Sequence, residues 1–167
     1  MNKKGSILDI MYVMILLFVF AVSTIIAFTV WENYKGATNS SSNINLSTPT
    51  FDHVEGKMDI VMNNFDYIFA FIMTGLIIML VVSTFFLKSH PAFFWITLLF
   101  LIIVLVIAGV LSNAFEEVGA NENLQAGYDN FPIIKFVMEK LPTFMLFIGA
   151  IVIISLYAKS RQEGGEY

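Results

Sequence analysis

The fold of this chain is decided by residues 68–117, which read IFAFIMTGLIIMLVVSTFFL (68–87), KSHP (88–91), AFFWITLLFLIIVLVIAGVL (92–111) and SNAFEE (112–117). Both apolar runs are twenty residues long and contain no Asp, Glu, Lys, Arg or His. An α-helix of about 20 apolar residues crosses a bilayer core of about 30 Å. Because only four residues separate the runs, the two helices must be antiparallel neighbours. The stretch therefore predicts a transmembrane helical hairpin.

The composition of the whole chain agrees with a membrane protein. Of its 167 residues 57% are hydrophobic, and only 13% are charged, whereas a soluble domain has about 25% charged residues. The formal net charge of −4 gives no reason to expect a nucleic acid as partner. The chain has no cysteine, which excludes disulfides and thiolate metal sites.

Two further uncharged segments complete the set of predicted spans, and the polar segments between spans each contain an amphipathic pattern. In the first, Met58, Val61, Met62 and Phe65 recur at helical spacing, and in the second a short helix is expected over residues 131–141. We therefore predict an all-α fold, a single membrane domain over residues 1–167 with four transmembrane helices and two short interfacial helices. The predicted spans are residues 10–31, 68–87, 92–111 and 141–158, and the predicted exterior loops are residues 32–66 and 112–140.

The orientation in the membrane is predicted from the basic residues. One side would hold five of them, in short segments next to span ends, where the positive-inside bias is strongest. These residues are Lys3, Lys4, Lys88, Lys159 and Arg161. The other side would hold Lys35, Lys57, Lys135 and Lys140. Both termini and the turn at His90 are therefore expected in the cytoplasm, or on the genome side if the membrane belongs to a virion.

Two sets of residues are candidates for contacts. Small and hydroxyl residues in the spans let helix backbones approach closely, and the candidates for helix–helix contacts are Ala70, Thr74, Gly75, Ala108, Gly109, Ser112 and Gly149. Residues of the second exterior loop are candidates for contacts with a partner, and these are Glu116, Glu117, Phe131 and Lys135.

The sequence offers little for catalysis. The predicted spans lack the intramembrane charges on which ion pumps and proton-coupled transporters depend. His53 and His90 are expected on opposite sides of the bilayer, so they cannot share a metal ion. Glu116 and Glu117 are adjacent and do not face one another on a helix, which leaves a solvated helix end or a loose cation or partner contact. We expect no enzyme activity, no cofactor, no metal and no small-molecule substrate.

Short polar words in the sequence resemble those of a known group of proteins. They are SHPAFF (89–94), LSNAFEE (111–117), KGSILD (4–9), FP (131–132), MEKLP (138–142) and LYAK (156–159). In these words the chain resembles small multi-span membrane proteins of viruses and phages whose particles contain a lipid membrane. The resemblance implies a structural role in a virion membrane, with contacts to the capsid or to neighbouring copies.

Three functional hypotheses follow. The first is a structural, self-associating virion membrane protein whose partners are the lipid bilayer and capsid or other membrane proteins. The second is an accessory subunit of a cellular membrane complex, which would co-purify with a defined partner. The third is a small pore or holin-like protein, which would need a polar stripe along one helix, whereas hydroxyl residues are sparse in these spans.

Overall fold

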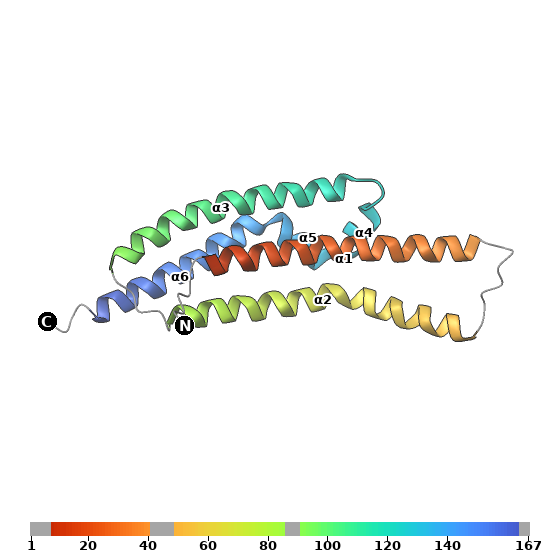
Figure 1. Cartoon of the computed structure of the whole chain (residues 1–167), viewed down its shortest axis with the longest axis horizontal. Coiled ribbons are helices and arrows are strands. Elements are labelled where there is room, and N and C mark those ends of the chain that lie inside the picture. Colours follow the sequence, from red (N-terminus) through yellow and green to blue (C-terminus); the bar gives the residue numbers. More distant parts are fainter. Residues whose placement is uncertain (1–7, 41–48, 86–90, 164–167) are drawn as a thin grey trace.

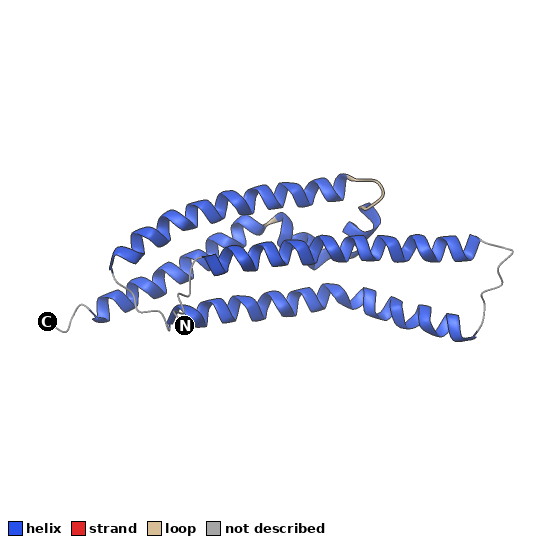
Figure 2. Cartoon of the chain, in the orientation of Figure 1, coloured by secondary structure: helices blue, strands red, loops and turns tan. Residues whose placement is uncertain are grey.

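The computed structural model describes residues 8–40, 49–85 and 91–163, and in these ranges the chain is helical apart from short turns (Figure 2). No strand is formed in the described ranges, and the predicted all-α fold is confirmed. The helices are α1 (Leu8–Ser40), α2 (Pro49–Phe85), α3 (Pro91–Ala120), α4 (Gln125–Asn130), α5 (Pro132–Glu139) and α6 (Leu141–Glu163).

The four long helices run lengthwise and contact one another, while α4 and α5 are short and lie near the far end of α3 (Figure 1). The start of α1, the end of α2, the start of α3 and the end of α6 lie at the same end of the bundle (Figure 1). The helices therefore run up and down in alternation. At the opposite end, α1 and α2 extend beyond the other elements (Figure 1).

Three helices are long and apolar enough to cross a membrane, and the bent pair α5–α6 is a fourth if it counts as one span. The three candidate stretches are Ile10–Thr38, His53–Val82 and Trp95–Ala120. The axes of α5 and the first part of α6 differ by 69°. By length and composition, three or four helices of the chain could therefore span a membrane, which indicates a membrane protein.

Proline marks where helices begin. Of the four prolines in the chain, Pro49, Pro91 and Pro132 occupy the first positions of α2, α3 and α5, and Pro142 is the second residue of α6. Proline fits the first turn because its missing N–H is not needed there and its φ is already helical. Pro142 also explains the elbow between α5 and α6, since it cannot donate to the carbonyl of Met138 four residues earlier.

The first predicted exterior loop, residues 32–66, is helical wherever the structure describes it. Helix α1 does not end at Trp31 but continues to Ser40, and α2 already begins at Pro49. The predicted interfacial helix around Met62 is part of α2. Part of its apolar face packs on α1, where the ring of Phe65 lies 6.3 Å from that of Phe20, while Val61 is 47% exposed. The amphipathic pattern therefore includes a contact with another helix, and contact with a lipid surface stays a prediction.

The second predicted loop, residues 112–140, is also largely helical. Helix α3 continues to Ala120, and α4 was not predicted from the sequence. The short amphipathic helix predicted over residues 131–141 is confirmed as α5, although its placement in a membrane interface is untested. The turn at His90, and with it Lys3, Lys4 and Lys88, lies outside the described residues.

Candidate functional site

The most distinctive part of the structure is the segment of residues 121–140, which we call the cap. It contains α4 and α5, connects α3 to α6, and contacts α1, α2 and α3 as well (Figure 1). Most of the longest-range polar contacts in the described chain converge on it. We therefore treat the cap and the residues that hold it as the candidate site.

Asp66 of α2 is the central polar residue of the site. Its side chain is buried, with 6% exposure, and its two carboxylate oxygens accept hydrogen bonds from the backbone N–H groups of Ile133 (2.9 Å) and Ile134 (2.8 Å). The first N–H groups of a helix have no partner inside the helix, and the helix dipole favours a negative charge there. Asp66 thus caps α5 from a different helix, because Phe131, the residue before α5, makes no side-chain cap.

The other end of α5 is held through contacts to Glu139, its last residue. The hydroxyl of Tyr128 donates to Glu139 Oε1 at 2.7 Å, and the hydroxyl of Ser112 on α3 donates to the backbone oxygen of Glu139 at 2.8 Å. Burial raises the pKa of the Tyr128 hydroxyl above its ordinary value, and the hydrogen bond to the Glu139 carboxylate raises it further. Both ends of α5 are therefore fixed by polar contacts to other helices.

The ring of Tyr128 fills the space between α3 and α4. Its centroid lies 5.3 Å from that of Phe115, and Lys135 Nζ lies 4.5 Å from it on one face. A Cβ at Gly119 would lie 2.5 Å from Tyr128 Cζ, closer than any real contact. Lys135 also pairs with Asp129 at 2.7 Å. Position 119 must therefore be glycine if the ring is to pack as it does.

Helix α4 lies directly on the backbone of α1. A Cβ at Gly127 would lie 2.8 Å from the backbone oxygen of Ile25 and 2.9 Å from Thr29 Oγ1. Next to this contact, Phe131 is buried with 1% exposure, and its ring meets that of Phe28 edge-on at 5.4 Å. The cap is thus packed against α1 at atomic contact.

A second polar cluster joins the extended parts of α1 and α2. Asp59 Oδ1 accepts hydrogen bonds from Trp31 Nε1 (2.8 Å) and Lys35 Nζ (3.0 Å), and Lys35 also pairs with Glu32. These contacts explain why the two helices continue together past the predicted span end. They involve the same two helices throughout and do not reach the cap.

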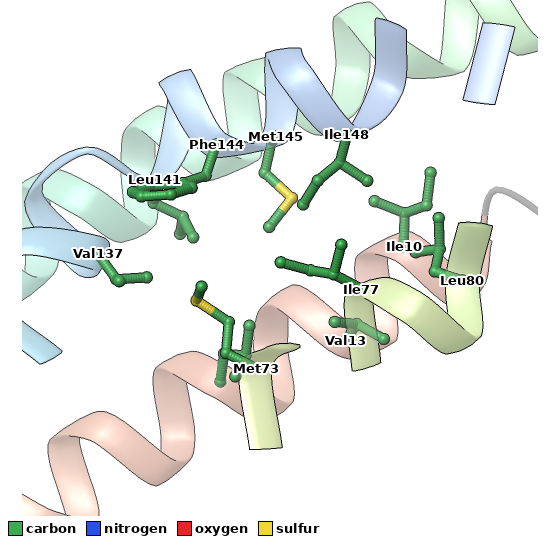
Figure 3. Close-up of a pocket in the computed structure, with 11 residues that line it drawn as sticks. Ile10, Val13, Met73, Ile77, Leu80, Val137, Leu141, Phe144, Met145 and Ile148 are labelled. Carbon is green, nitrogen blue, oxygen red and sulfur yellow. The ribbon is translucent and has the colours of Figure 1, made fainter. Parts of the chain in front are cut away.

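A small apolar gap lies under the elbow between α5 and α6. It is lined by side chains of α1, α2, α5 and α6, and Met73, Ile77, Val137 and Met145 point toward it (Figure 3). Its free volume of about 10 Å³ is at the lower limit for a single water molecule. No polar residue lines it, so it is a packing defect and offers nothing that would bind a polar substrate.

The candidates for helix–helix contacts divide into two groups. Ala108 is fully buried, Ser112 holds α5, and a Cβ at Gly149 on α6 would overlap Leu101 of α3, so this glycine lets the two helices approach closely. These three residues therefore serve contacts within the chain.

The remaining candidates lie elsewhere. Apart from the adjoining residues and backbone of the same helix, no atom lies within 4 Å of the position of a Cβ at Gly75 or Gly109. Thr74 is exposed, and its hydroxyl donates to the carbonyl of Ala70 one turn earlier. These residues are open to contacts outside the chain, and whether they make them stays a prediction.

The candidates for partner contacts also divide. Glu116 and Glu117 are exposed on α3. Phe131 faces the core, because its ring packs against α1, and Lys135 is engaged by Asp129 and the Tyr128 ring. Only the two glutamates present their side chains freely enough for a partner without rearrangement of the cap.

Asp66, Tyr128, Gly119 and Gly127 were not predicted from the sequence as residues of the site. Asp66 was expected just outside the second span, whereas it lies inside the stretch His53–Val82 that is long enough to cross a membrane. A lone carboxylate at the edge of an apolar run was the available signal, because such a residue needs a partner.

The polar side chains of the site join helices to one another. In the described ranges no group of three or more His, Cys, Asp or Glu side chains is placed to hold a metal ion. The polar groups of the cap pair with backbone N–H groups, a carbonyl and one another, an arrangement that joins helices. Compared with known proteins, the chain matches no protein-family model, no curated protein and no solved structure.

Proposed function

We propose that this chain is a structural, non-enzymatic integral membrane protein that acts through its surfaces. One observation carries the proposal: the buried polar residues of the described chain are engaged within the chain. Thr24 and Thr29 donate to backbone carbonyls one turn earlier, Ser112 holds Glu139, and Asp66 holds α5. Thr97, the fifth buried polar residue, also has a partner. None of these groups is left to bind or transform a substrate.

The lipid bilayer is the first partner that we infer. Large apolar side chains are exposed along the outer faces of the long helices, among them Phe71 (81%), Met79 (70%) and Phe147 (66%). Soluble proteins rarely expose contiguous apolar patches larger than a few hundred Å². Lipid would cover these faces, and extraction with alkaline carbonate tests this: the protein should stay in the membrane pellet, and its release would contradict the assignment.

Within this class, we favour a component of a virion membrane, on the sequence resemblance alone. The test is quantitative mass spectrometry of purified membrane-containing particles from the source organism. We expect many copies per particle; absence of the chain would end the virion assignment and leave the integral membrane assignment standing. Co-purification with one cellular complex at a fixed low ratio would instead identify an accessory subunit.

The pore hypothesis gains no support from the interior of the bundle. The gap between α1, α2 and α6 is lined only by apolar side chains (Figure 3). A conducting path through one copy would require polar lining, so we expect no conductance from the reconstituted chain. Steady single-channel currents in planar bilayers would contradict this expectation.

A further inference from the structure

Helix α5 depends on contacts from other helices for its position. It has eight residues, too few for a stable helix in isolation. Asp66 holds its first turn, Glu139 holds its last turn, and Ile134, Val137 and Met138 form its buried face. The polar contacts reach α5 from three other helices: Asp66 belongs to α2, while Ser112 of α3 and Tyr128 of α4 both donate to Glu139, the last residue of α5.

The connection between α5 and α6 has the features of a hinge. A single residue, Lys140, separates the two helices, and it is not helical, with φ −104° and ψ 18°. Pro142 follows two residues later and removes one of the backbone hydrogen bonds that would hold the two helices in line. The apolar gap lies directly under this elbow, lined by Val137 and Leu141 (Figure 3), so packing there is incomplete.

We propose that α5 is a hinged element that exists in a docked and an undocked state, and that the Asp66 carboxylate is the contact that keeps it docked. In the undocked state α5 turns about Lys140, its first turn leaves Asp66, the adjoining Phe131 leaves Phe28 of α1, and the apolar face of α5 is exposed. The carboxylate is suited to this role because it satisfies two N–H groups at once, one with each oxygen. Buried N–H groups left without an acceptor are strongly unfavourable, so loss of the carboxylate weakens docking specifically at this end.

An ionisable residue inside a membrane-spanning stretch usually suggests ion or proton transport. The geometry here favours docking, because both carboxylate oxygens are already directed at the backbone of α5. A transport role would also require further polar groups leading away from Asp66, and the gap nearest to the elbow has none.

Cysteine labelling tests the proposal in the full-length protein in lipid vesicles or detergent. The chain has no native cysteine, so Ile134→Cys places a single thiol at a position with 0% exposure on the inner face of α5. A second reporter, Val104→Cys on α3, also has 0% exposure and reports opening of the bundle itself. Labelling by a maleimide then measures how often each site opens.

The matched pair of variants is Asp66→Asn and Asp59→Asn. Both remove a carboxylate charge from α2. The side chain of Asp59 accepts hydrogen bonds from Trp31 and Lys35 of α1, whereas that of Asp66 accepts from α5. In Asp66→Asn one of the two acceptor oxygens becomes an amide NH2, a donor that would face a backbone N–H of α5. We therefore expect Asp66→Asn to accelerate labelling at position 134 at least tenfold and Asp59→Asn by less than twofold. Labelling at position 104 should stay slow in both.

Three results would overturn the proposal. The first is an unchanged rate at position 134 in Asp66→Asn. The second is equal acceleration by Asp59→Asn. The third is equal acceleration at positions 134 and 104, which would mean that Asp66 holds the whole bundle and not α5. If Asp66→Asn is too unstable to purify, Asp66→Glu, which keeps both acceptor oxygens but moves them by one methylene, is judged by the same criteria, with faster labelling expected at position 134 and not at position 104.

Discussion

The contact between α4 and α1 gives the sharpest stability prediction. Gly127 lies within α4, and no described glycine has a positive φ, so its backbone conformation is open to any residue. What excludes a side chain is space: a Cβ would stand 2.8 Å from the Ile25 carbonyl oxygen and 2.9 Å from Thr29 Oγ1. Neither neighbour can move easily, because the Thr29 hydroxyl donates to that same carbonyl at 2.9 Å.

The variant Gly127→Ala must therefore push α4 away from α1. Overpacking of this kind costs about 1–3 kcal/mol, and the higher helix propensity of alanine offsets up to about 1 kcal/mol of that. We expect a net loss of about 1–2 kcal/mol in the free energy of unfolding. The matched control is Gly109→Ala in α3, where the new Cβ meets no atom within 4 Å apart from the adjoining residues and backbone of its own helix. There we expect no loss, or a gain of up to about 1 kcal/mol.

Denaturant unfolding in detergent micelles, followed by tryptophan fluorescence, measures both variants against the parent protein. The double variant Gly127→Ala, Thr29→Ala should recover only part of the loss, because the Ile25 carbonyl still blocks the Cβ. Equal stability of Gly127→Ala and Gly109→Ala would refute the inferred contact between α4 and α1.

Three further predictions concern the cap and the bundle. Phe131→Ala should lower the free energy of unfolding by about 3–5 kcal/mol, measured by the same method, whereas a side chain reserved for a partner would leave it unchanged. Because the pKa of Tyr128 is raised by burial and by its contact with Glu139, the neutral hydroxyl contributes stability fully below about pH 10 and loses it as the pH rises further. We expect the free energy of unfolding to fall more steeply between pH 9 and pH 11 in the parent protein than in Tyr128→Phe. This range covers about two pH units around the ordinary tyrosine pKa, and parallel profiles of the two proteins would contradict the prediction. Val13→Ile should fill part of the apolar gap and raise stability by about 0.5–1 kcal/mol, whereas Val104→Ile, at a fully buried position, should lower it.

Local information determined the class of the fold. Runs of uncharged apolar residues such as 68–85 and 92–111 form long helices, because in lipid the backbone must satisfy its own hydrogen bonds. The prolines mark the first turns of helices for an equally local reason, as Pro132 does for α5. The short amphipathic helix near residue 136 was predictable from its periodicity in the same way.

Only the tertiary structure decided how far the helices extend and what holds the cap. Helix α1 passes Trp31 because Trp31 and Lys35 meet Asp59, 28 and 24 residues away in the sequence. Asp66 finds its partners 67 and 68 residues later, and Gly127 is required by the backbone of α1. Local hydropathy carries no information about such pairs, since a carboxylate beside an apolar run looks the same in the sequence whether it faces solvent or caps a distant helix.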